Sequence, residues 1–177
     1  MTYLNTRHIA AIALCAAYWA ILNNTLSPIL FRLTGTPFVC DLLAFTTLIL
    51  VGWWTRKLGI MSLTGLLVTG IAFMLQPNAT QMIGFVFASI LFDIMTKLVG
   101  YNNSFDKPSS STLLLLSLST ICALIAGLII GSVFIKPNPA IWFILGWGGL
   151  HAVGGFIGGI VGLILVNALR TRITVPS

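Results

Sequence analysis

The chain has 177 residues, of which 58% are hydrophobic and only 7% carry charge, and its mean hydropathy is +1.05. Soluble domains carry charge on about a quarter of their residues, so this composition excludes a soluble fold and predicts one transmembrane domain over residues 1–177. The net charge of +6 comes from basic residues scattered over short polar gaps, which excludes a nucleic-acid-binding surface.

Six apolar stretches, each long enough for a bilayer core of about 30 Å, are separated by Pro, Asn, Gly and charged residues. They predict an all-α bundle of six transmembrane helices near residues 8–26, 37–55, 58–75, 80–100, 112–135 and 139–169. The first stretch has the layout of a signal peptide, but the bulky Leu14 precedes Cys15 where lipoprotein processing needs a small residue. We therefore expect it to stay a helix.

Alanine recurs through this first span, and Ala13/Ala17 and Ala16/Ala20 are each spaced four residues apart. Positions that face lipid favour larger side chains, so an alanine strip indicates a face that another helix approaches closely. That helix belongs either to the same bundle or to a partner. The connection that follows, residues 27–37, is long enough to fold over the bundle as a lid.

Ionisable side chains inside a membrane are costly, so each one is informative. Asp41 lies near the outer end of the second span, where it either forms a salt bridge with Arg32 or Lys136 or contacts a ligand directly. Asp93 lies in the fourth span one helical turn before Lys97, and this spacing predicts an ion pair between the two.

Polar residues also gather where the first span ends and the fourth begins. Asn23 and Asn24 end the first span, and Asn78, Thr80 and Gln81 stand at the start of the fourth. They either cap turns and helices or form the polar rim of an extracellular pocket. Residues 101–111 form the one long polar loop, whereas residues 55–57, 76–80 and 136–139 are expected to be tight turns.

The sixth span combines one histidine with aromatic residues. Trp147 precedes His151 by four positions and Gly154 follows it by three, so they share one helical face, with Trp142 a further turn outward. His151 is either a satisfied histidine between helices or the polar tip of an aromatic wall that suits a flat heteroaromatic ligand.

The same span is about 31 residues long, or about 46 Å as a helix, so it must tilt, bend or protrude. Its glycines include the pairs Gly154/Gly158 and Gly158/Gly162, which permit close helix contact within the bundle or with a partner subunit.

The three cysteines, Cys15, Cys40 and Cys122, lie far apart in apolar stretches and have no metal-ligand spacing. We expect them to be small packing residues, and we expect neither a metal nor a cofactor.

Basic residues predict the direction of the bundle, because Lys and Arg are retained on the cytoplasmic side. With the N-terminus inside, the cytoplasmic set is Arg7, Arg56, Lys57, Lys97, Lys107, Arg170 and Arg172, and only Arg32 and Lys136 lie outside. Both ends of the chain are therefore expected in the cytoplasm.

These features resemble the S component, the membrane-embedded substrate-binding subunit, of energy-coupling factor (ECF) vitamin transporters. The resemblance covers nearly the whole chain and rests on the alanine strip, the long first loop, the Arg56-Lys57 turn and the glycine-rich last helix that ends at residues 167–170. It implies six helices with both termini in the cytoplasm.

The resemblance also implies partners and a place for the substrate. Ala13, Ala16, Ala17 and Ala20 would contact a transmembrane T subunit that two cytoplasmic ATPases drive. The outer halves of the later helices would hold the substrate beneath the first loop. By location, this makes Trp142, Trp147, His151, Asp41, Asn23, Asn78 and Gln81 the candidate substrate-binding residues.

We therefore expect a non-enzymatic subunit in a prokaryotic cell membrane that captures a vitamin or other micronutrient, with a thiamin-like or pyrimidine compound as the first candidate. The chain has no GxxxxGK[ST] motif, so ATP use would belong to other chains. An autonomous secondary transporter or channel is an alternative, although internal repeats and polar residues along the bundle are not evident. An intramembrane enzyme is a second alternative and would need Asp41, Asp93 and His151 to converge in space.

Overall fold

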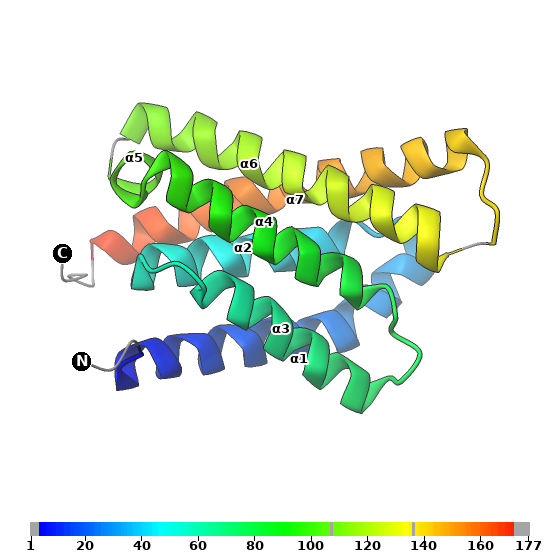
Figure 1. Ribbon diagram of the computed structural model, residues 1–177, viewed down its shortest axis with the longest axis horizontal. Helices are drawn as coiled ribbons and strands as arrows, with labels where there is room; N and C mark the ends of the chain where they lie inside the picture. The colour runs from blue at the N-terminus through cyan, green and yellow to red at the C-terminus, as the bar shows by residue number, and fades with distance from the viewer. Residues whose placement is uncertain (1–3, 107, 136, 172–177) are drawn as a thin grey trace.

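The computed structural model describes residues 4–106, 108–135 and 137–171, and every element within these ranges is helical. Six long helices run roughly along one axis (Figure 1): α1 (Thr6–Thr34), α2 (Phe38–Thr55), α3 (Ile60–Leu75), α4 (Met82–Val99), α6 (Pro108–Ile129) and α7 (Ile141–Arg170). A short helix, α5 (Tyr101–Phe105), joins α4 to α6, and a π-helical turn, η1 (Ile130–Phe134), extends α6.

Five of these helices are long and apolar enough to cross a membrane: α1, α2, α4, the α6–η1 segment over Thr112–Phe134, and α7. The remaining long helix, α3, has 16 residues and is also apolar, but it is only about 24 Å long at 1.5 Å per residue. The fold is therefore all-helical, with helices of the length and composition found in multi-pass membrane proteins.

The first helix does not end where the sequence predicts. It continues to Thr34 through Pro28, so the expected lid over residues 27–37 is wrong for all but its last residues. A proline inside a helix lacks an N–H and crowds the carbonyl four residues earlier, yet this helix continues, and the polar residues before Pro28 bond within it: Asn24 Nδ2 donates to the Ala20 carbonyl at 2.8 Å. The helix stops at Gly35, whose left-handed backbone lets its N–H bond the Phe31 carbonyl.

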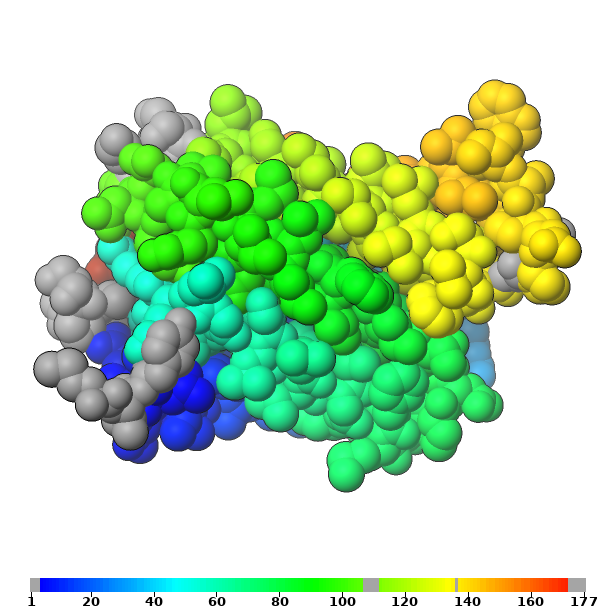
Figure 2. All heavy atoms as spheres, in the orientation of Figure 1, coloured from blue at the N-terminus to red at the C-terminus, as the bar shows by residue number. Residues whose placement is uncertain are grey.

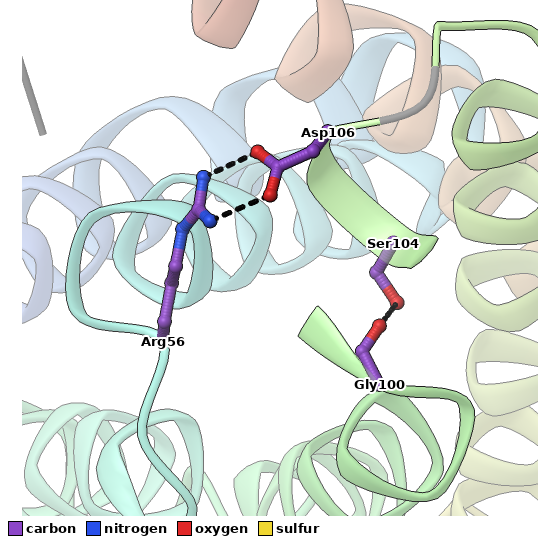
Figure 3. A network of polar contacts seen from close by, with 4 residues as sticks. All are labelled: Arg56, Gly100, Ser104 and Asp106. Carbon is purple, nitrogen blue, oxygen red and sulfur yellow. Dashed lines mark hydrogen bonds and ion pairs between the residues drawn. The ribbon is translucent and has the colours of Figure 1, made fainter. Parts of the chain in front are cut away.

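The predicted polar loop at 101–111 is also largely helical, because α5 occupies its first half and α6 begins at Pro108. Proline suits the first turn of a helix, where its missing N–H costs nothing. A bidentate ion pair joins this connection to the α2–α3 turn (Figure 3). Arg56 Nη1 and Nη2 lie 2.8 and 2.6 Å from the two carboxylate oxygens of Asp106.

The last helix packs between α2 and α6 through its glycines. A Cβ atom on Gly158 would lie 2.8 Å from the Leu42 carbonyl of α2, and one on Gly155 would lie 2.6 Å from the Ser119 carbonyl of α6. Thr46 of α2 donates to the Gly158 carbonyl at 3.1 Å. Of the two predicted uses of this glycine spacing, the structure therefore shows close packing within the bundle.

Asp93 has a different partner from the one the sequence predicts. Its Oδ2 accepts hydrogen bonds from the Gly59 and Ser62 backbone N–H groups and from Ser62 Oγ, at 2.8 to 3.0 Å. These donors belong to the start of α3, so the carboxylate of α4 caps a neighbouring helix. The predicted ion pair with Lys97 is wrong: Lys97 Nζ instead lies 5.6 Å from the centroid of the Tyr101 ring.

The first turn of α1 and the last turn of α7 lie at the same end of the bundle (Figure 1). The described basic residues of the predicted cytoplasmic set belong to helix ends there: Arg7, Arg56, Lys57, Lys97 and Arg170. Arg32 lies near the other end, and Lys107, Lys136 and Arg172 lie outside the described residues. Figure 2 shows the start of α7 projecting beyond the bundle at the end away from the first turn of α1.

Candidate functional site

A cavity of about 400 Å³ lies at the end of the bundle opposite the first turn of α1 and the last turn of α7. Its lining comes from the outer part of α1, the start of α2, the α3–α4 turn, the η1 end of α6 and the first half of α7. Segments that are far apart in sequence therefore meet around one space of the size that small-molecule sites occupy.

His151 of α7 lines this cavity and contacts Asp41 of α2, which stands behind it. His151 Nδ1 lies 2.7 Å from Asp41 Oδ2, and the two side chains are 2% and 0% exposed. Apart from this contact, neither the imidazole nitrogens nor the carboxylate oxygens have a hydrogen-bond partner. A buried polar group without a partner is costly, so this pair has unused hydrogen-bonding capacity beside the cavity.

Glycines hold the histidine and the neighbouring tryptophan in place. A Cβ atom on Gly127 of α6 would lie 2.6 Å from the Cβ of His151, and one on Gly131 of η1 would lie 3.1 Å from the Cβ of Trp147. The two glycines are four residues apart, and so are Trp147 and His151. A strip of glycines on α6 and η1 therefore packs against a strip of bulky side chains on α7. This close packing sets the direction of Trp147 and His151.

The walls of the cavity are aromatic. The Trp147 ring stacks on Phe143 at a centroid distance of 5.7 Å, meets Phe31 of α1 edge-on at 6.4 Å, and lies 6.0 Å from the His151 ring. Phe85 of α4 lies 6.0 Å from the same imidazole on another side. The Trp147 Nε1 donor is buried and has no partner. A flat ring entering the cavity would meet π-faces and unpaired polar atoms together.

The rim contains amides and a hydroxyl. Asn23 and Ser27 of α1 line the cavity and bond each other, with Ser27 Oγ donating to Asn23 Oδ1 at 3.2 Å. Gln76 and Gln81 line it from the α3–α4 side. Asn24 also lines the cavity. Because Pro28 has no N–H, the Asn24 carbonyl does not accept the hydrogen bond that the residue four positions later donates in a regular helix.

The structure brings together most, but not all, of the predicted substrate-binding residues. Trp147, His151, Asn23 and Gln81 line the cavity, and Asp41 contacts it through His151. Asn78 is exposed in the α3–α4 turn and does not line it. Trp142 is 79% exposed and lies outside the cavity, because it sits on the projecting start of α7.

The salt bridge predicted between Asp41 and Arg32 does not form, and the alternative with Lys136 is not tested. Arg32 is exposed at the end of α1 and has no contact with the carboxylate, and Lys136 lies outside the described residues. Asp41 pairs with His151 instead, a residue more than one hundred positions away on α7. The spacing of charges along the chain gave no sign of this pairing.

The alanine strip on α1 divides into two parts. Ala16 and Ala20 are buried inside the bundle at 2% and 1% exposure, where they pack against the other helices of this chain. Ala13 and Ala17 are exposed. Residues four apart stack on one strip of a helix, whereas consecutive residues such as Ala16 and Ala17 point about 100° apart, so the boundary between core and surface runs between the two pairs.

Several cavity residues were not predicted. Phe31 and Ser27 were assigned to a lid, and Cys40 was expected only to pack, whereas it is half-buried and lines the cavity. Phe85 follows Gln81 by one helical turn, so the predicted rim residue already indicated its face. Of the described residues, no three His, Cys, Asp or Glu side chains lie close enough together to hold a metal ion.

No protein-family model, curated protein or solved structure matches the chain.

Proposed function

We propose that this chain is the substrate-binding S component of an ECF-type importer, which captures a vitamin or other micronutrient for uptake powered by partner ATPases. The observation that carries the proposal is the cavity, whose aromatic walls surround a buried imidazole–carboxylate pair with unpaired polar atoms. Capture requires a site of this kind and no catalytic group.

The proposal includes a topology of six membrane spans, with α3 as the sixth and both ends of the chain in the cytoplasm of a prokaryotic cell. Basic residues at the end of the bundle that holds the first turn of α1 and the last turn of α7 support this orientation. In that orientation the cavity opens toward the outside of the cell, where a substrate to be imported is found.

The volume of the cavity supports a ligand of vitamin size, since small-molecule sites range over about 300–1,000 Å³. A thiamin-like or pyrimidine compound is the first candidate. Its flat ring would lie against Trp147 and Phe85, and its ring nitrogens and exocyclic amine would meet the polar atoms of His151 and the rim.

Coupling to the ATPases would use the exposed part of the alanine strip. Ala13 and Ala17 present small side chains on the outer surface of α1, where a helix of a transmembrane T subunit can approach closely. Ala16 and Ala20 support this surface from inside and are not themselves contact residues in the proposal.

Co-expression with the T subunit and two ATPases of the source organism tests the proposal. The unaltered chain should co-purify with all three, and the double variant Ala13→Leu/Ala17→Leu should lose them because leucine blocks close helix approach. The matched control Ser117→Leu alters an exposed small residue of α6 and should assemble normally. Substrate uptake by the isolated chain in liposomes, driven by an ion gradient, would instead support an autonomous secondary transporter.

A further inference from the structure

Acidic and basic side chains are unevenly distributed around the cavity. Among the described residues, its lining holds no Lys, Arg, Asp or Glu, and the one histidine in it, His151, has the buried Asp41 carboxylate behind it. Arg32 follows the lining residue Phe31 but is exposed and does not line the cavity. Within residues 4–106, 108–135 and 137–171, the only acidic group in contact with the lining therefore has no basic side chain other than an imidazole to balance it; Lys136, which follows the lining residue Ile135, lies outside these residues.

The Asp41–His151 pair has a limited set of charge states. With the carboxylate ionised and the imidazole neutral, the pair has a charge of −1, and one added proton brings it to zero. A positive pair needs a second proton on two buried groups 2.7 Å apart. A buried anionic ligand would require that second proton or would stay uncompensated, and both are costly in an apolar site.

A cationic or neutral ligand meets no such obstacle. A singly positive ligand beside the pair in its −1 state gives a total charge of zero, as the added proton does. The aromatic walls favour the same choice, because the faces of Trp147, Phe31 and Phe85 carry the negative part of the ring quadrupole. The rim residues Asn23, Asn24 and Gln81 add amide groups and no positive charge.

We infer that the cavity selects by charge: it accepts neutral or singly positive heteroaromatic compounds and rejects carboxylates and phosphates. That these compounds are micronutrients for import rests on the proposed function. The charge preference itself belongs to the cavity and to Asp41. This charge preference favours bases and amides, such as aminopyrimidines, as substrates. It excludes vitamins that carry an acid group.

Cys40 provides a direct test because it lines the cavity and is a free thiol, whereas Cys15 and Cys122 are buried elsewhere and can be replaced by alanine. The chain in lipid nanodiscs is treated with two methanethiosulfonate reagents of similar size, one carrying a trimethylammonium group and the other a sulfonate. The ratio of the two rate constants at Cys40 is divided by the same ratio for 2-mercaptoethanol. This division removes the intrinsic difference between the reagents.

We expect the normalised ratio to exceed about tenfold in favour of the cation, which corresponds to about 1.4 kcal/mol. Asp41→Asn should lower it to within about threefold of unity, while the control Asp106→Asn, at the opposite end of the bundle, should leave it unchanged. The ratio of the chain with Asp41 intact decides the question even if Asp41→Asn does not fold.

A normalised ratio at or below unity, or no reaction of Cys40 with either reagent, would overturn the inference. So would a ratio that Asp41→Asn leaves unchanged. These results are independent of assembly with the ATPases: a chain that fails to co-purify with them but keeps the tenfold ratio loses the importer proposal and retains the charge selection.

Discussion

The two buried aspartates of this chain lie in opposite surroundings. Asp93, toward the end of the bundle that holds the first turn of α1, accepts hydrogen bonds from three donors at the start of α3 through one carboxylate oxygen. Asp41, near the other end, has a single close contact, with His151, and no further hydrogen bond from the backbone or side chain of another helix among the described residues; the Oδ1 atom of each aspartate has no partner there. The comparison shows that burial alone does not reveal a binding role, because one carboxylate is consumed by the fold and the other remains available beside a cavity.

The same contrast runs along α7. From Gly154 onward its glycines press against α2 and α6, with backbone atoms within van der Waals distance. Before His151, a Cβ atom added to Gly146 or Gly149 would meet no neighbour within 4 Å, whereas one on Gly148 would lie 2.8 Å from the Leu128 side chain of α6, and the helix start projects from the bundle. The part of α7 from Gly154 onward is thus packed against two helices, whereas its outer part packs on α6 along one face and leaves the opposite face open.

The largest expected effect comes from removing the structural aspartate. Asp93→Ala leaves the Gly59 and Ser62 donors at the start of α3 without an acceptor, and we expect it to destabilise the bundle by about 3 kcal/mol. Asp106→Ala, which breaks a partly exposed ion pair, should cost less than about 1 kcal/mol. Unfolding in mild detergent measures both, and equal losses would contradict the structural role of Asp93.

A smaller effect is expected from the glycine contacts. Gly158→Ala places a Cβ 2.8 Å from the Leu42 carbonyl, a backbone atom that cannot move away alone, and should destabilise the bundle by about 1–3 kcal/mol. Gly149→Ala lies in open space on the same helix and should be neutral or stabilise it by up to about 1 kcal/mol. Thermal unfolding of the two variants separates these outcomes, and the boundary drawn within α7 would be wrong if both behaved alike.

The two tryptophans of the outer α7 sharpen the comparison further. Trp147→Ala removes a wall of the cavity and should weaken binding of the co-purifying small molecule about tenfold, as expected for the loss of one aromatic contact of about 1.4 kcal/mol. Trp142→Ala should change the dissociation constant by less than about twofold, because Trp142 is exposed outside the cavity. Titration calorimetry compares them, and a larger loss for Trp142 would move the site to the projecting end of α7.

The helices could be predicted from the sequence because the length of an apolar stretch is a local property of the chain. All six predicted stretches correspond to long helices. Most of the predicted helix ends lie within a few residues of the observed ends. The first helix is the exception, since Pro28 and the polar residues around it suggested a break. The structure shows that those side chains bond to their own helix, as Ser27 does to Asn23, so the break does not occur.

Partnerships between helices were harder to predict, because they depend on distances that the sequence does not contain. Asp93 was paired with Lys97 on spacing alone, whereas the competing donors at Gly59 and Ser62 come from another helix. His151 was identified as a candidate from its isolation in an apolar span. Its contact with Asp41 required the packing of α7 on α2.

The most direct measurement is mass spectrometry of the small molecules retained by the chain after purification in mild detergent. We expect one compound in near-equal amount to the unaltered chain, neutral or singly positive, and we expect its loss from His151→Leu, in which the polar tip of the cavity is gone. Retention by Asp93→Asn should remain normal in the fraction that folds. A compound held equally well by His151→Leu, or none held by the unaltered chain, would contradict a ligand site built around the Asp41–His151 pair.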